Sequence, residues 1–156
     1  MAAKEKFYVV CDNKQAMHAY FIEDRYEAGI VLQGREVKAL REGRANLRDG
    51  YAVFRGLELY LINTHIAPYS HSAELSHDPL RTRKLLMKRS ELHKLWGRMQ
   101  IRGYSLIPLK IYFKDGFAKV EVALAKGKKL HDKRQATKER EADRYMAKIT
   151  KKHRHQ

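Results

Sequence analysis

The residue types that carry catalysis or bind metals form no recognisable arrangement in this sequence. His65, His71 and His77 lie six residues apart, a spacing that matches no compact ligand motif, and no cysteine lies near them. Cys11 is the single cysteine, and no evident basic neighbour would activate its thiol. The sequence also contains no P-loop, no Gly-x-Gly-x-x-Gly motif and no Gly-x-Ser-x-Gly motif. We therefore expect no enzyme activity, no metal and no cofactor.

The chemistry that the sequence does offer is that of cations. Lys and Arg number 33 against 18 Asp and Glu, which gives a formal net charge of +15 over 156 residues. Such an excess favours a polyanionic partner, either a nucleic acid or an anionic membrane surface. No apolar run approaches the roughly 18 residues that span a bilayer, and the N-terminus has no apolar stretch of signal-peptide length. The sequence thus predicts a soluble, basic protein with a cytoplasmic location.

About half of this charge lies in a C-terminal tail, residues 126–156. The tail holds 12 of the 33 basic residues and 4 of the 18 acidic ones, but few large apolar residues. It cannot bury enough apolar surface to offset the entropy of ordering, so we expect it to be disordered or loosely helical in the free protein. Residues 137–151 contain no proline or glycine, and their charges alternate at helical spacing, which predicts a helix on contact with a partner. The alternative is a solvated basic tail without a specific role.

The elements that must position the remaining cations are mostly strands. Apolar runs and alternating patterns predict strands over 19–22, 28–32, 51–54, 57–62, 104–113 and 117–125. Gly56 and the Asp115-Gly116 pair are turn residues typical of hairpins. Apolar residues at helical spacing predict helices over 34–43 and 82–100. Residues 1–125 therefore form, by prediction, a mainly β domain: a small antiparallel barrel of the oligonucleotide-binding (OB) type with two or three helices.

Six strings, in this order along the chain, resemble the bacterial SmpB family, which binds transfer-messenger RNA (tmRNA, or SsrA RNA). They are YFIE at 20–23, YEAG at 26–29, GREVKALR at 34–41, GRANL at 43–47, HDPLRTRKLL at 77–86 and ALAKGKKLHDKR at 123–134. The last is the most specific, because Lys-Gly-Lys-Lys is followed after two residues by Asp-Lys-Arg. The resemblance covers about residues 6–145.

This resemblance implies a function in ribosome rescue. It implies binding of the tRNA-like part of tmRNA and delivery, with elongation factor Tu and GTP, to ribosomes stalled without a usable codon. The protein then stands in for the missing anticodon arm, its tail enters the vacant mRNA channel of the small subunit, and the nascent chain is tagged for proteolysis. The implied partners are tmRNA, the ribosome and elongation factor Tu, with no membrane. GTP hydrolysis and peptide transfer belong to the factor and the ribosome, so the resemblance implies no catalysis here.

The resemblance also implies which residues contact RNA. Family contact positions map onto Glu27, Leu86 and Lys119, and we add Glu36; the candidates for phosphate contacts are Lys38, Arg41, Arg81, Lys84, Lys126, Lys128 and Lys129. For Glu27, whose carboxylate would accept bonds from base amino groups, the alternative is a structural salt bridge. For Leu86 the alternative is core packing within the predicted helix. Lys119 is out of phase with Val120 and Val122, so it should face away from the core.

The tail carries a second set of implied contacts. The family resemblance places Asp132, Lys133 and Arg134 at the ribosomal decoding centre, with His131 adjacent to them. There the cations would bind phosphates and the imidazole would stack on an exposed base. Composition alone leaves three other classes open: a constitutive ribosomal or generic RNA-binding OB protein, an RNA-modifying or RNA-cleaving enzyme with an undetected site, and an architectural DNA-binding protein.

Overall fold

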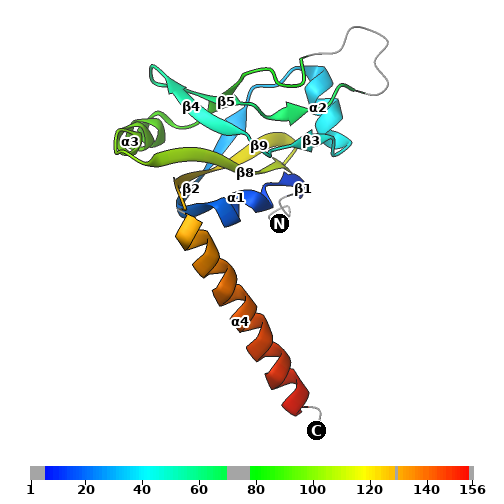
Figure 1. Cartoon of the computed structure of the whole chain (residues 1–156). Coiled ribbons are helices and arrows are strands. Elements are labelled where there is room, and N and C mark those ends of the chain that lie inside the picture. The colour runs from blue at the N-terminus through cyan, green and yellow to red at the C-terminus, as the bar shows by residue number, and fades with distance from the viewer. Residues whose placement is uncertain (1–5, 70–77, 129, 155–156) are drawn as a thin grey trace, which may run out of the picture.

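A computed structural model of the chain describes residues 6–69, 78–128 and 130–154, and it is built around one antiparallel sheet (Figure 1). The strand order is β1-β8-β4-β5-β7-β2-β9. Because β8 pairs with β9 as well as with β1 and β4, the sheet closes on itself. The strands are β1 (Phe7–Asp12), β2 (Tyr20–Ile30), β4 (Tyr51–Arg55), β5 (Glu58–Ile62), β7 (Arg83–Leu86), β8 (Tyr104–Lys114) and β9 (Phe117–Gly127). Two short strands, β3 (Ala45–Asn46) and β6 (His65–Ile66), pair separately. The prediction of a mainly β, barrel-like fold is confirmed.

The hairpin of β8 and β9 is the longest and best-paired part of the barrel. Asp115 and Gly116 both have positive φ angles, 50° and 85°, as a tight hairpin turn requires. Along β9, Val120 and Val122 are fully buried while Lys119 and Glu121, which alternate with them, are partly exposed. This alternation puts one side of the hairpin in the core and the other side toward solvent, as predicted.

The strands predicted at 19–22 and 28–32 are one strand, β2, and the sequence missed the short helix α1 (Lys14–Ala19) before it. The charged residues between the two predicted strands are accommodated because they point outward and form ion pairs. Asp24 pairs with Arg98, and the Arg25 guanidinium lies 3.2 Å from a Glu121 carboxylate oxygen. A β-bulge between residues 22 and 24 adjusts the register to β9.

The single helix predicted over 82–100 is wrong. The structure has a strand, β7, followed by the helix α3 (Arg89–Met99). In β7 the side chains alternate, with Arg83 and Leu85 buried and Leu86 exposed by 52%. Two adjacent leucines fit a helix or a strand, and the choice depends on pairing with β5 and β2, which are distant in sequence. Leu86 is therefore not a helix core residue.

Three helices surround the barrel and a fourth leaves it. The helix α2 (Gly34–Arg41) confirms the helix predicted at 34–43, and it begins with a capping box between Gln33 and Glu36. Figure 1 shows α2 and α3 at opposite ends of the barrel, and α1 beside the start of α4 (Leu130–Arg154). None of the helices that the structure describes is long and apolar enough to cross a membrane.

The tail is the helix α4 in this structure, and the expectation of a disordered or loosely helical tail in the free protein stays a prediction. Packing does not explain the helix, since the side chains described from 138 to 151 are exposed except for partly buried Ile149. Its described contact with the barrel is at α1, where the Arg140 guanidinium lies 2.9 Å from His18 Nδ1. A sequence from 128 onward without proline or glycine, with charges at helical spacing, is sufficient to account for the helix.

Candidate nucleic-acid interface

Three of the predicted RNA-contact residues, from three different strands, meet on one face of the sheet. On β2, Gly29 is the direct cross-strand partner of Leu86 on β7 and of Lys119 on β9. Direct partners in a sheet share a face, so the side chains of Leu86 and Lys119 flank the glycine. Glu27 precedes Gly29 by two residues and shares that face. We call this side of β1, β8, β9, β2 and β7, turned away from the core, the outer face.

The outward direction of these residues follows from the burial of their neighbours. Ala28, Ile30, Leu85 and Val120 all point into the core and are 9% exposed or less. Because strand side chains alternate, the residues between them must face outward. The alternation that predicted an outward Lys119 is therefore confirmed.

Glu27 forms a structural ion pair and yet stays accessible for an RNA contact, the two roles that the sequence left open. Its carboxylate accepts a hydrogen bond from the Tyr112 hydroxyl and lies 3.7 Å from the Lys114 ammonium group. The Glu27 side chain nevertheless remains 42% exposed. Burial of the Tyr112 ring, together with the bond to Glu27, raises the pKa of Tyr112 far above its ordinary value, so the hydroxyl stays protonated and donates. Glu27 is thus an oriented, accessible acceptor.

Lys84 extends the outer face toward β5. It precedes Leu86 by two residues, so both side chains point the same way. Lys84 Nζ lies 3.0 Å from Glu58 Oε1, and the Tyr60 hydroxyl donates to Glu58 Oε2 at 2.6 Å. The hydrogen bond to Glu58 raises the pKa of Lys84, which keeps it charged. Because the ion pair is exposed, Lys84 can exchange Glu58 for a phosphate with little loss of free energy.

Glu36 is in the interior, so the predicted RNA contact by Glu36 is wrong. Its side chain is fully buried, with Arg81 Nη2 at 2.5 Å from Oε1 and Arg83 Nε at 2.5 Å from Oε2. Burial alone would raise the pKa of Glu36, but hydrogen bonds from Arg81, the Gln33 backbone N–H and Arg83 outweigh it and lower that pKa. Glu36 therefore joins α2 to the segment that enters β7.

The two arginines of this cluster differ in their access to solvent. Arg83 is fully buried and donates to the carbonyl oxygens of Thr64 at 2.8 Å and Pro79 at 3.2 Å. Arg81 is 29% exposed and donates to Glu36 and to the Val31 carbonyl oxygen. Arg81 can therefore reach an RNA only in part, and Arg83 is a structural residue. Sequence reasoning missed Arg83, because nothing in its local pattern distinguishes a buried arginine from an exposed one.

Of the two candidate cations on α2, Arg41 lies at the turn between β8 and β9, while Lys38 Nζ lies 5.4 Å from the centre of the Tyr69 ring. Lys38 and Arg41 are both exposed. The Arg41 guanidinium lies 4.9 Å from the centre of the Phe113 ring, and Arg41 lines a hollow of about 600 Å³ together with Phe7 and Gly116. The structure thus brings Arg41 to the end of the barrel where Lys119 lies.

The remaining predicted cations are at the other end of the barrel. Lys126 Nζ lies 4.7 Å from the centre of the Tyr104 ring, and Lys128 Nζ lies 5.0 Å from that of Phe21. Lys119 and Lys126 are seven positions apart on β9, a span of about 23 Å. The predicted contacts therefore fall into two groups, with the second beside the start of the tail.

The tail residues themselves are only partly described. Lys129 lies outside the described residues, as do His71 and His77 of the histidine spacing. The backbone of His131, Asp132, Lys133 and Arg134 forms the first turns of α4.

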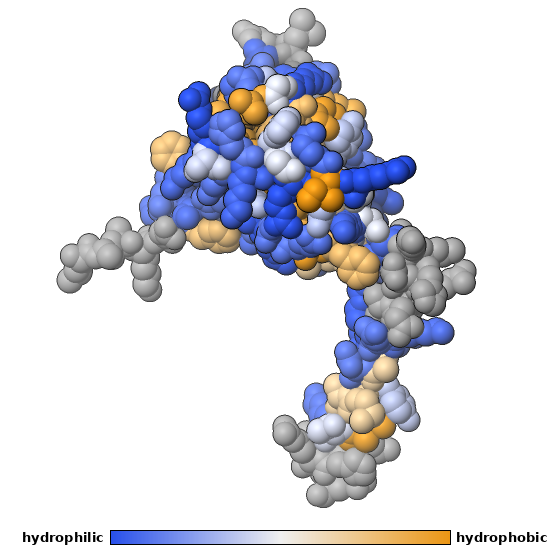
Figure 2. Space-filling view, turned by 90° about the vertical axis from the view of Figure 1, so that its left-hand side faces the viewer, coloured by the Kyte–Doolittle hydropathy of each residue, from blue (hydrophilic) through white to orange (hydrophobic). Residues whose placement is uncertain are grey.

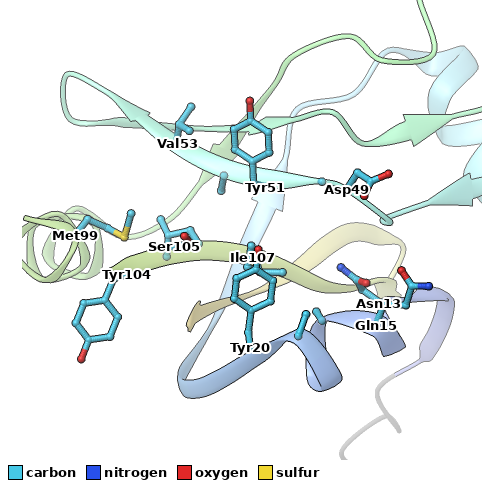
Figure 3. A pocket seen from close by; sticks show the side chains of 15 residues that line it. Asn13, Gln15, Tyr20, Asp49, Tyr51, Val53, Met99, Tyr104, Ser105 and Ile107 are labelled. Carbon is cyan, nitrogen blue, oxygen red and sulfur yellow. The ribbon is translucent and has the colours of Figure 1, made fainter. Parts of the chain in front are cut away.

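A groove beside α1 has almost no charged lining residues. A groove of about 510 Å³ runs between β4, β8 and α1 (Figure 3). Tyr20 and Tyr51 come from its opposite walls, but Asp49 is its one acidic or basic lining residue. Within residues 6–69, 78–128 and 130–154, no three His, Cys, Asp or Glu side chains are grouped so that they could hold a metal ion. Figure 2 shows a largely hydrophilic surface on the side of α3, with scattered hydrophobic residues.

Comparison with known proteins shows the family of this chain. A family model described as SmpB protein matches residues 10–152. The SsrA-binding protein of Geobacter metallireducens is 55% identical over 139 residues, covering 89% of this chain and 91% of the relative. The SsrA-binding protein of Desulforudis audaxviator is 52% identical over 149 residues, covering 96% of this chain and 97% of the relative.

A solved structure agrees as well. A chain from the structure described as "tmRNA-SmpB: a journey to the center of the bacterial ribosome" matches with a TM-score of 0.68 and 45% identity, covering 81% of this chain and 93% of that one. The resemblance that the sequence motifs indicated is therefore confirmed, and this chain belongs to the SmpB family.

Proposed function

We propose that this chain binds the tRNA-like part of tmRNA and delivers it to stalled ribosomes for trans-translation. The observation that carries the proposal is the convergence of Glu27, Leu86 and Lys119 around Gly29, from three strands that are far apart in sequence. The names of the relatives, which are SsrA-binding proteins, and of the matched tmRNA-SmpB structure support the same partner.

The three side chains supply three different contacts with a folded RNA. Lys119 provides a cation for a phosphate, and the exposed Leu86 provides an apolar surface for the face of an unstacked base. Glu27 cannot favourably contact a phosphate, but its oriented carboxylate can accept hydrogen bonds from a base amino or imino group. A surface of this kind recognises loops with unpaired bases better than a regular duplex.

The tail has a separate role in this proposal. Residues 1–125 hold the tmRNA, while residues 126–156 enter the vacant mRNA channel as the body of the protein stands in for the anticodon arm. Lys126 and Lys128 lie where the tail leaves the barrel, and His131, Asp132, Lys133 and Arg134 follow directly. In a channel lined by ribosomal RNA, helical ordering of the tail would be offset by many phosphate contacts.

The protein acts here as an RNA-binding adaptor and not as a catalyst. Elongation factor Tu with GTP would accompany the complex, and the ribosome would perform peptide transfer. Since its partner is the ribosome, the protein works in the cytoplasm.

Measuring the affinity for tmRNA at a low and a high salt concentration tests the first half of the proposal. A specific binder keeps its preference over an unrelated RNA when salt weakens the electrostatic attraction. We compare the wild-type protein with a Leu86→Ala/Lys119→Ala variant and with a matched control, Ile101→Ala/Arg102→Ala, which also removes one exposed apolar side chain and one exposed cation. The first variant should bind at least about tenfold more weakly, a change of ~1.4 kcal/mol, and the control should bind normally. Equal loss in both variants, or equal affinity for an unrelated RNA, would refute specific binding.

A scrambled tail tests the second half. Residues 128–154 are reordered at constant composition, so the net charge stays the same. The scrambled protein should still bind tmRNA but fail to support tagging of a stalled nascent chain in a reconstituted translation system. If tagging survives scrambling, the contacts assigned to individual tail residues are wrong.

A further inference from the structure

We infer that Phe7 and Phe117 form a stacking platform for two unpaired bases of the bound RNA, with Lys114 between them as a phosphate contact. This inference rests on the proposed tmRNA binding, because it extends the same surface. It adds two aromatic side chains, from the N-terminal strand and from the tip of the β8–β9 hairpin, that the sequence analysis did not assign to RNA.

The two rings are more exposed than folding alone explains. Phe117 is 70% exposed and Phe7 is 53% exposed. Large aromatic side chains normally bury most of their area, which is worth roughly 25 cal/mol per Å² removed from water. The neighbouring Phe113, on the core side of β8, is only 6% exposed, so the barrel has its own buried aromatic at this end. The exposed pair is thus available to a ligand.

Sheet register places both rings on the outer face. Phe7 is the cross-strand partner of Lys114, and Lys114 is the partner of Phe117, so the three side chains form one row across β1, β8 and β9. The next row is Tyr112, Lys119, Gly29 and Leu86. The aromatic row is therefore directly continuous with the proposed RNA contacts.

Phe7 is held in place before any ligand arrives. Its ring centre lies 4.8 Å from that of Tyr112, with the planes tilted by 36°, and Lys110 Nζ lies 5.6 Å from the Phe7 ring centre. Tyr112 is in turn hydrogen-bonded to Glu27. One face of Phe7 is thus supported by the same network that orients Glu27, which lowers the entropy lost when a base stacks on the ring.

The charges around the rings favour a polyanion over an apolar protein surface. Lys114 and Lys119 belong to the two rows, Lys110 lies beside the Phe7 ring, and Arg25 lies further along β2 on the same face. Two of the nearby acidic residues are already paired with cations: Glu121 lies 3.2 Å from Arg25 and 3.3 Å from Lys110, and Glu27 lies 3.7 Å from Lys114. The third, Asp115 at the hairpin tip, accepts a hydrogen bond from the Lys6 backbone N–H. Aromatic rings set among cations are the usual surface for unpaired nucleotides.

The distance between the two rings determines which form of RNA can stack on both of them. Phe7 and Phe117 are two strands apart, which separates them by roughly 10 Å in a sheet. Successive bases in a duplex are stacked at about 3.4 Å, so two neighbouring stacked bases cannot occupy both rings. The platform therefore fits bases that are splayed out of a loop.

A direct measurement of stacking uses tryptophan fluorescence. Trp96, the only tryptophan, lies on α3, so a Trp96→Phe/Phe117→Trp protein reports from position 117 alone. Its fluorescence should be quenched when the tRNA-like part of tmRNA is added, and much less by a fully paired RNA duplex of equal length. Unchanged fluorescence on binding of the tRNA-like RNA would overturn the inference.

Affinity measurements complete the test. Phe7→Ala and Phe117→Ala should each weaken the binding of tmRNA by about 5- to 150-fold, which corresponds to the usual free energy of stacking one base on one aromatic ring. Phe117→Trp should retain affinity, and Ile101→Ala, which removes an equally exposed side chain elsewhere, should not change it. Thermal unfolding of each variant shows that the barrel is intact.

The outcomes separate this inference from the proposed function. If the phenylalanine variants bind normally while Leu86→Ala/Lys119→Ala does not, the platform is wrong and tmRNA binding stands. If none of them affects tmRNA affinity, the proposed function fails as well. If the phenylalanine variants bind RNA normally but lose association with elongation factor Tu, the patch is a protein contact and the inference is overturned.

Discussion

Replacing Glu36 by glutamine should destabilise the folded protein strongly. Glutamine has nearly the same shape but no charge, so Arg83 loses the only carboxylate that contacts its fully buried guanidinium in the described structure. Arg81, the other partner of Glu36, is 29% exposed and can turn its charge toward water. The effect of the substitution is therefore concentrated on one buried cation.

The expected loss of stability follows from the contacts that remain. Removing one member of a buried ion pair costs about 3–5 kcal/mol. The lower end applies here, because Arg83 still donates to the carbonyl oxygens of Thr64 and Pro79 and the glutamine amide oxygen can still accept a bond. We expect a loss of about 3 kcal/mol, a large part of the roughly 5–15 kcal/mol that stabilises a typical domain.

Urea unfolding at pH 7, followed by circular dichroism, measures this loss. The matched control is Glu58→Gln, since Glu58 also pairs with a basic side chain but at an exposed site, and it should change stability little. A loss below about 1 kcal/mol for Glu36→Gln, or an equal effect in both variants, would refute the reasoning from burial.

The pH dependence gives the same test independently. The pKa of Glu36 is lower in the folded protein than its ordinary value of 4.5, so the ionised carboxylate stabilises the fold above that value. This contribution is lost as the pH falls through the folded-state pKa. The stability difference between wild type and Glu36→Gln should therefore narrow as the pH falls below 4.5, and a difference that stays constant as the protein is titrated further into acid would contradict the assignment.

Three further predictions follow from other parts of the structure. Burial raises the pKa of Cys11 to about 11, so alkylation of its thiol at pH 8 should be roughly 100-fold slower in the folded than in the unfolded protein. Gly50→Ala would place a Cβ atom 2.6 Å from the Thr64 hydroxyl and 3.1 Å from a carbonyl oxygen, so it should lower the unfolding free energy by about 1–3 kcal/mol in a urea titration. In the control, Gly34→Ala, the new methyl group enters open space at the start of α2, so the unfolding free energy should be unchanged or slightly higher. Lys119→Ala should reduce the slope of log affinity against log salt for tmRNA by about 1, and an unchanged slope would show that Lys119 contacts no phosphate.

Local sequence patterns were sufficient to predict the elements whose partners are close in the chain. The β8–β9 hairpin is one example, because Asp115-Gly116 lies between two alternating runs that pair with each other. The helix α2 is another, since its glycine flanks and its acidic residue in the first turn act locally. The tail helix also follows from the local spacing of charges, although we expected at most a loose helix without a partner.

Elements whose form depends on distant partners could not be predicted in this way. The strand β7 has only four residues and was taken for part of a helix, because its pairing with β5 and β2 is invisible in its own pattern. The burial of Arg83 and Glu36 has the same origin. Each looks like a surface residue in sequence, and only the packing of α2 against the segment before β7 removes both from water.

The candidate interface depends on a register that no local pattern contains. The family resemblance named Glu27, Leu86 and Lys119, but their meeting around Gly29 requires β2 to lie between β7 and β9 with one particular alignment. A shift of one residue in either pairing would turn one of these side chains toward the core. The exposed Phe7 and Phe117 were missed for the same reason, since exposure of an aromatic residue becomes visible only when the strands are placed.

The strand β9 connects the two groups of cations and thereby fixes the distance between them. Lys119 and Lys126 belong to one continuous strand that is hydrogen-bonded on both sides, to β2 and to β8, so their separation of about 23 Å cannot change without breaking the barrel. A flexible link would let both groups bind the same stretch of RNA. In the proposed function, a rigid link would hold the first group on tmRNA while the second group and the tail face the ribosome, as an adaptor between the two requires.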